Sequence, residues 1–368
     1  KLSAAVDGVV MQSKGIVVDT FHCDLLAEQD TRDAMDLDLV PEELVVQLIH
    51  ARNSIAKLRT YQEELHLVDP IDNELPVKEI GEWLKTSQLR SVVMKHQTTV
   101  QNVLTSMILA CTDDDNLDPL TREGTARPTQ QRLFFEQGAI RVVVAILNET
   151  FIGKAVPRWV VEQRSLGVAF VKMGQLAFRF LRQVVQDNPA NKKVMERHTA
   201  LLLSQLGSEM KTANVLTELY KSNLELLKKV DESEIMKYIN LLNASPWPRF
   251  LNFLSVLCVS NGVPIPENQR KVVDLLIIRN PHLLVTARIE KSDGGRPKEV
   301  WLSHADGTTF ALSTLTASED KFMVKDTAIM TQNELRMAYY LKVLDVYHDV
   351  SVGRNRGGID VLIEKSEL

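Results

Sequence analysis

Cysteine is scarce in this chain of 368 residues, and its few cysteines lie far apart. Cys23, Cys111 and Cys258 form no Cys-x-x-Cys pair, so the sequence indicates neither a disulfide framework nor a thiolate zinc site. We therefore expect reduced thiols inside a cell. Residues 1–5 are not followed by the apolar core of a signal peptide. The chain begins with Lys rather than Met, which indicates a piece of a longer protein.

Long hydrophobic runs and an excess of basic residues are also lacking. Apolar stretches such as residues 142–147 are far shorter than the ~20 residues of a membrane helix, so we expect this chain itself to be soluble. The 43 basic and 48 acidic residues give a net charge of −5. Because a broad nucleic-acid surface usually makes a domain basic, no nucleic acid is expected as a partner.

Aromatic residues make up 6% of the chain, with 16 glycines and 13 prolines, so strands and tight turns are expected to be rare. Helical periodicity runs from about residue 41 to residue 281. The longest helix is predicted over 160–186, where apolar residues recur every three or four positions. Lys172, Arg179 and Arg182 share its opposite face, which we interpret as solvated. Pro189 disfavours helical geometry at Asn188 and is expected to end this region.

Shorter helices are predicted before and after this one, joined by connections of two to eight residues. Many helices of this size with short connections and no sheet between them predict an all-α fold, an armadillo/HEAT-like helical solenoid with degenerate repeats. The shorter helices are expected over 41–51, 54–67, 77–87, 89–111, 130–149, 191–206, 211–220, 223–230, 231–243, 248–260 and 266–278.

One segment departs from the helical pattern. Residues 299–303 and 308–312 are β-prone and flank a turn containing Asp306 and Gly307, which predicts one inserted β-hairpin. A loop is expected over 291–298, a helix over 334–349, and a basic, glycine-rich loop over 353–358. The resulting division is an N-terminal segment at 1–40 (a linker or the end of an upstream β domain), a solenoid at 41–290, a loop and hairpin insert at 291–318, and further solenoid helices at 319–368.

Residue chemistry alone does not predict a catalyst. No nucleophile, Walker or zinc-ligand motif is present. Asp113, Asp114, Asp115 and Asp118 form an acidic cluster, but an EF-hand loop starting at Asp113 would need glycine where Asp118 stands. We interpret this cluster as a loop between helices. The glycine-rich loop at 353–358 lacks phosphate-loop spacing. The sequence therefore predicts an interaction module that is not an enzyme and that needs neither a metal nor a cofactor.

Residues 248–269 are similar to a string found in one family of proteins. The run Pro-Arg-Phe-Leu-Asn-Phe-Leu-Ser-Val-Leu-Cys-Val-Ser resembles the RIH domain, an armadillo solenoid of the inositol trisphosphate receptors and ryanodine receptors. Residues 131–137, 180–187 and 299–302 resemble further motifs of these receptors in the same order. The resemblance spans about residues 89–362, and the combination of four ordered motifs is fairly specific.

The resemblance implies a cytosolic regulatory and ligand-sensing solenoid of an intracellular calcium-release channel, a ligand-gated homotetramer. It implies upstream β-trefoil domains and neighbouring channel subunits as partners. The full-length protein would be embedded in the endoplasmic reticulum or another calcium-store membrane, with this part on the cytosolic face. A short hairpin followed by a helix favours the inositol trisphosphate receptors. The sequence of residues 260–263, in contrast, is slightly more similar to that of the ryanodine receptors. We favour the former.

A free-standing armadillo-type adaptor that binds extended peptides is the alternative of a different class. Peptide grooves of that kind usually carry regularly spaced asparagine and tryptophan side chains. The tryptophans of this chain show no such spacing, which argues against the adaptor. They are Trp83, Trp159, Trp247 and Trp301.

The positions that hold inositol trisphosphate in the receptors are mostly uncharged here. In the family, three basic residues at the start of one helix contact the ligand, and they align with Pro128, Arg132 and Phe135 of this chain. Only Arg132 keeps a positive charge. Arg127 lies next to Pro128. The second basic site carries no cation in this chain. Its three positions are Asn188, Pro189 and Ala190.

Lys192 and Lys193 follow the second site and could replace its cations if the helix start were shifted in register. Arg127 and Arg132 are the corresponding candidates at the first site. Phosphates favour arginine forks and helix N-termini, and most of the usual cations are missing. The resemblance therefore predicts that inositol trisphosphate binds weakly or not at all.

Overall fold

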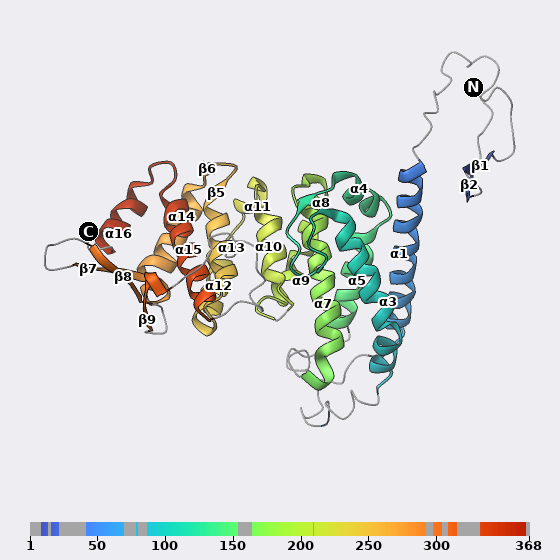
Figure 1. Cartoon of the computed structure of the whole chain (residues 1–368), viewed down its shortest axis with the longest axis horizontal. Coiled ribbons are helices and arrows are strands. Elements are labelled where there is room, and N and C mark those ends of the chain that lie inside the picture. The colour runs from blue at the N-terminus through green and yellow to red at the C-terminus, as the bar shows by residue number, and fades with distance from the viewer. Residues whose placement is uncertain are drawn as a thin grey trace, which may run out of the picture.

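The computed structural model describes residues 9–13, 16–21, 42–69, 79, 87–153, 164–208, 210–291, 297–303, 308–314 and 332–365. Over these residues, helices stack side by side in an elongated row, from α1 (Glu42–His66) at one end to α16 (Arg356–Lys365) at the other (Figure 1). The prediction of a mostly helical solenoid with an inserted β-hairpin is confirmed.

The N-terminal half of the row is built around α7 (Arg164–Val185), which packs against helices on both sides. Its residues Leu176, Phe180, Leu181 and Val184 are completely buried, as the periodicity predicts. The other elements of this half are α3 (Gln88–Cys111), α4 (Pro128–Glu136), α5 (Ala139–Asn148), the π-helix η2 (Glu149–Gly153), α8 (Pro189–Met195), the 3₁₀ turn η3 (Glu196–His198) and α9 (Thr199–Ser204).

The C-terminal half continues the same apolar core without interruption. α13 (Pro248–Cys258), which contains the motif that carries the family resemblance, lies between α10 (Thr212–Tyr220) and α15 (Gln332–Ser351). Phe253 stacks on Tyr238 with ring centroids 3.9 Å apart. The remaining helices are α11 (Leu224–Leu227), α12 (Glu232–Ala244), α14 (Pro266–Val272), the π-helix η4 (Val273–Ile278), the 3₁₀ turn η5 (Pro281–Leu283) and α16.

A three-stranded antiparallel sheet of order β7-β8-β9 lies at the C-terminal end of the row. β8 (Pro297–Ser303) and β9 (Thr309–Ala311) pair with Leu302 opposite Phe310, which confirms the predicted hairpin. β7 (Thr286–Lys291) is a strand that the sequence pattern did not predict. Short pairs also join β1 (Val9–Ser13) to β2 (Ile16–Phe21), β3 (Thr112–Asp113) to β4 (Thr125–Ala126), and β5 (Val259–Ser260) to β6 (Val263–Pro264).

Several predicted helix boundaries are wrong. The two helices predicted over 41–51 and 54–67 are one continuous helix, α1 (Glu42–His66), because Ala51, Ser54 and Ile55 are buried along a single face. The helix predicted over 130–149 is divided between α4 and α5 by Gly138, which takes a left-handed φ of 77°. The segment 191–206 is divided by a 3₁₀ turn, and α16 occupies part of the loop predicted at 353–358.

The break after α7 is confirmed at the predicted place. Asp187 has a φ of 50°, Asn188 caps the next helix with its side chain, and Pro189 is the first residue of α8. Most of the helix predicted over 77–87 lies outside the described residues, as do Cys23, Trp83 and Trp159. Cys111 and Cys258 are free thiols in the core, and burial raises the pKa of each.

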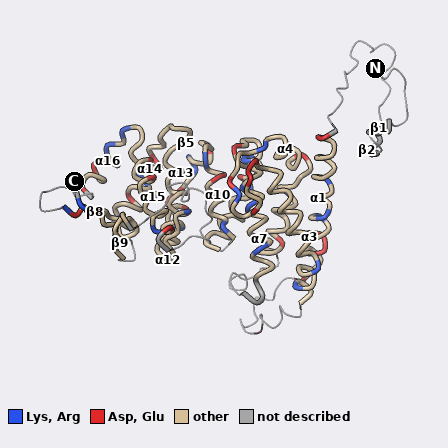
Figure 2. Tube along the Cα trace, in the orientation of Figure 1, with Lys and Arg blue, Asp and Glu red and all other residues tan. Residues whose placement is uncertain are grey.

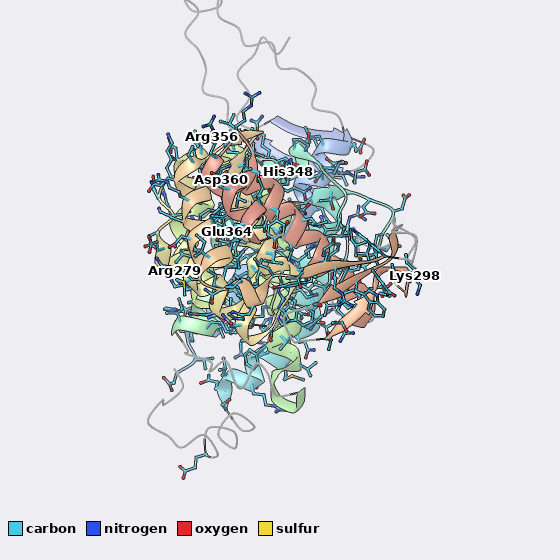
Figure 3. The ribbon with its side chains drawn as sticks, turned by 90° about the vertical axis from the view of Figure 1, so that its left-hand side faces the viewer. Arg279, Lys298, His348, Arg356, Asp360 and Glu364 are labelled. Carbon is cyan, nitrogen blue, oxygen red and sulfur yellow. The ribbon has the colours of Figure 1, made fainter. Side chains whose placement is uncertain are left out.

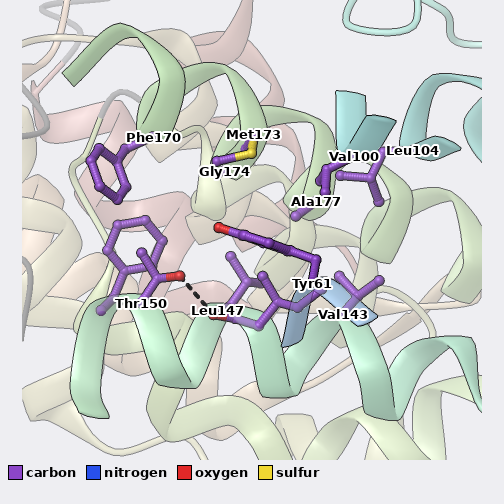
Figure 4. A pocket seen from close by; sticks show the side chains of 12 residues that line it. Tyr61, Val100, Leu104, Val143, Leu147, Thr150, Phe170, Met173, Gly174 and Ala177 are labelled. Carbon is purple, nitrogen blue, oxygen red and sulfur yellow. Dashed lines mark hydrogen bonds between the residues drawn. The ribbon is translucent and has the colours of Figure 1, made fainter. Parts of the chain in front are cut away.

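A small cavity lies inside the N-terminal half, between α1, α3, α5 and α7 (Figure 4). It measures about 20 Å³, and Tyr61, Val143, Leu147 and Ala177 are among its mostly apolar lining. The Thr150 hydroxyl donates to the carbonyl of Ile146 at 2.8 Å and so is satisfied within its own helix. A space of this size holds about one water molecule, which excludes a polyphosphate.

Candidate functional site

The two segments that the resemblance aligns with the ligand site lie beside each other in the fold. The first begins α4, where Arg127 is the N-cap residue and Pro128 the first helical residue. The second begins α8, with Asn188 as N-cap and Pro189 in the first turn. The Asn188 side-chain amide donates to Oε1 of Gln131, on α4, at 3.1 Å. Two helix starts far apart in the sequence therefore meet at one place.

Gln131 holds this junction together. Its side chain is buried, and its Nε2 donates to the carbonyls of Gln183 and Gln186 at 2.8 Å each, at the end of α7. Asn191 is also buried and donates to the carbonyl of Val184 at 2.7 Å. Each of these amides satisfies backbone carbonyls that the end of a helix leaves without a partner. Both are structural positions that the sequence reading did not single out.

Each candidate cation on α4 is paired with an acidic side chain of the same chain. Arg127 contacts Asp113 at 2.5 Å, and Nε of Arg132 donates to Glu136 at 2.7 Å, one helical turn further on. Glu136 raises the pKa of Arg132 through this hydrogen bond. The side chain of Arg132 is 78% exposed, so it does not line a closed site.

The two lysines of α8 differ in their surroundings. Lys192 is buried, and its ammonium donates to the carbonyl of Lys221 at 2.8 Å and to Glu218 at 3.3 Å. Burial lowers the pKa of Lys192, and Glu218 partly opposes this. Lys193 is exposed and donates to Glu225 at 3.0 Å, and this hydrogen bond raises its pKa. Lys192 therefore joins α8 to α10, whereas Lys193 is exposed to solvent.

The aligned positions without charge have structural roles or face solvent. Pro128 and Pro189 each occupy the first helical position, where the missing N–H costs nothing. Phe135 packs against the apolar core. Ala190 is exposed beside Pro189. The assignment of the candidate residues to a ligand site stays a prediction.

A second charged cluster connects the α3–α4 loop, which we define as residues 112–127, to α7. Glu123 accepts from Nη1 of Arg179 at 3.0 Å and from both terminal nitrogens of Arg182 at 2.6 Å each. Burial raises the pKa of Glu123, but the two arginines outweigh this and lower it overall. Arg179 is only 7% exposed. The interpretation of Arg179 and Arg182 as a solvated face is therefore wrong.

Arg122 organises the same loop from within. It is buried, and its guanidinium donates to the carbonyls of Thr112, Asp114 and Asn116 at 2.5–2.6 Å and to the Thr112 hydroxyl at 2.8 Å. The sequence offered no sign of this role, because an arginine in a polar loop is usually exposed.

The acidic cluster is also used internally. Asp114 accepts from the backbone N–H of Asn116 and of Glu123 at 2.9 Å each, and the bond from Asn116 is the main cause of its lowered pKa. Among the residues that the structure describes, no three His, Cys, Asp or Glu side chains gather in a way that could hold a metal ion.

The basic residues of the 353–358 segment lie at the far end of the solenoid. Arg356 begins α16, and Asp360 and Glu364 follow on the same helix (Figure 3). Along the described part of the chain, basic and acidic residues are interspersed from one end of the row to the other (Figure 2). None of the helices described has the length and apolar composition needed to cross a bilayer.

Comparison with known proteins identifies a family and a relative of this chain. The sequence model of the RIH domain, shared by the ryanodine and inositol trisphosphate receptors, matches residues 90–289. The chain is also 26% identical over 276 residues to the inositol 1,4,5-trisphosphate receptor-like protein A of Dictyostelium discoideum. That alignment covers 72% of this chain but only 8% of the relative.

Proposed function

This chain belongs to the RIH domain family, and we propose that it is the regulatory solenoid of an inositol trisphosphate receptor-like calcium-release channel. The match over residues 90–289 carries this proposal, and the similarity to the Dictyostelium receptor-like protein favours that branch over the ryanodine receptors. The role is non-catalytic: the solenoid passes a signal from N-terminal domains to the pore, on the cytosolic face of a calcium-store membrane.

The shape of the solenoid suits transmission. Its core runs without interruption from α1 to α15, and interlocked helices of this kind move as stiff bodies. A ligand that prefers one packing of the N-terminal domains would rotate the whole row, and neighbouring subunits would respond to that rotation.

We further propose that inositol trisphosphate binds this solenoid weakly or not at all. Each of the four candidate cations is paired with an acid: Asp113, Glu136, Glu218 or Glu225. An incoming phosphate would have to displace these carboxylates or lie beside them, and charge-assisted hydrogen bonds contribute only about 1.5–3 kcal/mol each. Exposed pairs exchange at little cost, but the displaced acid remains nearby and repels the phosphate.

Calorimetric titration of inositol trisphosphate at low salt tests the binding proposal, both on this chain and on the full-length protein. We expect no heat of binding on either at ligand concentrations up to about 1 mM. A dissociation constant below about 1 μM on the full-length protein would contradict it. A matched variant restores two of the missing family cations with Pro128→Arg and Ala190→Lys, both at exposed positions, and binding should then become measurable.

The channel role is tested separately by calcium flux. The full-length protein in vesicles loaded with calcium should release it through a pore, and deletion of residues 90–289 should abolish regulation while leaving the pore in the membrane. Failure to conduct calcium under any condition would contradict the channel role without bearing on inositol trisphosphate.

A further inference from the structure

The sheet at the C-terminal end of the row has an open edge along β7. This strand pairs with β8 on one side, and in the described part of the chain no strand pairs with its other side. The hairpin of β7 and β8 projects from the end of the row (Figure 1). Every residue of β7 except Glu290 is exposed. The unpaired backbone N–H and C=O groups of such an edge are a template for a further strand.

The side chains of β7 restrict which strand can pair there. Ile289 occupies the middle of the strand and is 53% exposed. Its neighbours Arg288 and Glu290 share the opposite face of the sheet, because side chains alternate along a strand. Charged side chains usually protect an edge strand from pairing. Two charges of opposite sign give no such protection against a strand that presents them in the reverse order.

A second β7 presents that reverse order when it runs antiparallel to the first. With Ile289 opposite its own counterpart, Arg288 of each copy lies opposite Glu290 of the other, and two opposite-charge pairs cross the new edge. The smallest slide that keeps every side chain on its face is two residues. Such a slide puts arginine opposite arginine, or glutamate opposite glutamate. The charges of β7 are therefore self-complementary in one register.

Negative charge gathers at the place where the second arginine would arrive. Glu290 lies directly opposite Glu299 of β8, and like charges in that position repel each other. A hydrogen bond from the Trp301 indole lowers the pKa of Glu290. A hydrogen bond from Ser313 likewise lowers the pKa of Glu299, so both carboxylates are ionised at neutral pH. A cation from another chain would relieve this repulsion.

The side chains that would pair are available for it. Arg288 is exposed and forms no hydrogen bond or ion pair with another described residue. Oε2 of Glu290 accepts from Trp301 at 2.8 Å, which holds the carboxylate in place. Its Oε1 has Lys298 at 3.4 Å, and that ammonium is 65% exposed. An exposed pair of this length contributes little and leaves Oε1 open to a stronger donor such as a guanidinium.

We propose that β7 pairs antiparallel with β7 of a second copy of the chain, so that the two sheets become one. The same surface is used by both copies, and the contact is therefore isologous and has a two-fold axis. Adjacent subunits of a ring larger than a dimer are not related by a two-fold axis, so in such a ring this contact would join one assembly to another.

The pairing is expected to be weak. One pair of short strands buries less than the ~1,000 Å² of a stable interface, so isolated chains associate reversibly and at high concentration. This inference concerns contacts between copies and depends neither on the channel role nor on inositol trisphosphate.

Single cysteines test the contact and its register. Ile289→Cys, in a Cys23→Ser background, places two thiols directly opposite each other in the proposed pair, within reach of a disulfide. The buried Cys111 and Cys258 are shielded from oxidant. After mild oxidation, this variant alone should give a disulfide-linked dimer and no larger species.

Ala287→Cys and Lys291→Cys in the same background are the matched controls. Both positions are exposed and lie on the same face as Ile289. In the proposed register residue 287 of one copy lies opposite residue 291 of the other. Each control variant alone should therefore stay mostly monomeric, whereas a mixture of the two should give a dimer.

Charge reversal tests the pairs directly. Arg288→Glu in the Ile289→Cys chain should lower the dimer yield at least about fivefold, and adding Glu290→Arg should restore much of it, because the charges are then opposed in the reverse order. Circular dichroism checks that every variant is folded. Three results would overturn the proposal: no cross-link at about 1 mM chain, a yield insensitive to Arg288→Glu, or as much dimer from Ala287→Cys alone as from Ile289→Cys.

Discussion

Glu123 shows how one residue can determine the surroundings of others far away in the sequence. Its carboxylate, on the α3–α4 loop, forms ion pairs with both Arg179 and Arg182 of α7. Arg179 is almost fully buried, and a buried guanidinium without its carboxylate would be costly. The arginines of α7 are therefore parts of the fold, and the loop that supplies their partner is fixed to α7 by the same contact.

Replacing Glu123 with glutamine should lower the free energy of unfolding by about 1–2 kcal/mol at pH 7. The value lies below that for a fully buried pair because the carboxylate is 38% exposed and solvent screens it. Since the folded-state pKa is depressed below 4.5, the stabilisation is complete above that pH and is lost as pH falls through the folded pKa.

Urea unfolding of wild type and Glu123→Gln between pH 3 and pH 7 measures this directly. The difference between the two proteins should shrink steadily below about pH 4.5. The exposed Glu136→Gln variant serves as the control and should change little at any pH. A difference independent of pH would contradict the assignment of the effect to this carboxylate.

Lys192 distinguishes a structural lysine from a ligand-binding one. Lys192→Met leaves the carboxylate of Glu218 buried without its partner and should cost about 3 kcal/mol of stability. Adding Glu218→Gln should recover at least half of that loss, as a double-mutant cycle measured by urea unfolding would show. Lys193→Met, at an exposed pair, should have no measurable effect on stability. A Lys192→Met variant as stable as wild type would show that the pair does not hold α8 to α10.

At the scale of an element, the α3–α4 loop is closed by Gly124. A Cβ at this position would lie 1.9 Å from the backbone oxygen of Asp113, which cannot move without opening the β3–β4 pair. Gly124→Ala should therefore destabilise the protein by about 2 kcal/mol or more, measured by thermal or urea unfolding.

Gly357→Ala in α16 is the matched control. The nearest atom that its Cβ would meet is 3.8 Å away, so alanine should be neutral or slightly stabilising there. Equal effects at the two glycines would contradict the role of close packing in the loop.

Helices with one clear apolar face could be predicted from the sequence, and their internal breaks could not. The face of α7 and the stop at Pro189 follow from periodicity and from the geometry that proline imposes on its neighbour. The break at Gly138 was missed because glycine within a helical pattern is often tolerated. β7 was missed because its side chains are mostly exposed and give no apolar alternation.

The candidate site was predictable only in part, for a related reason. The resemblance predicted that the starts of two helices contribute to one ligand site. In the structure, these helix starts, those of α4 and α8, lie beside each other. The acid that pairs with each cation comes in most cases from a different helix or loop, so no local pattern reveals it. The same holds for Glu123 and the arginines of α7, which are separated by more than fifty residues.

At the scale of the whole molecule, the solenoid has a well-packed middle and a less protected start. α7, α10 and α13 pack against neighbours on both sides, and most of their side chains are buried. Among residues 43–50 of α1, whose side chains the structure describes, none is fully buried, and Val46 is 48% exposed. Stability in a stack of this kind comes from interfaces between neighbours, so the end with one neighbour opens first.

Hydrogen–deuterium exchange followed by mass spectrometry should therefore show different amide exchange rates along the chain. Amides of α7, α10 and α13 should exchange slowest, near the rate of global unfolding, whereas residues 43–50 of α1 should exchange faster by at least about a hundredfold. Residues 51–66 of the same helix should be intermediate, because Ala51, Leu58 and Leu65 are buried against α3 and α5. Protection of residues 43–50 equal to that of α7 at low chain concentration would contradict this order.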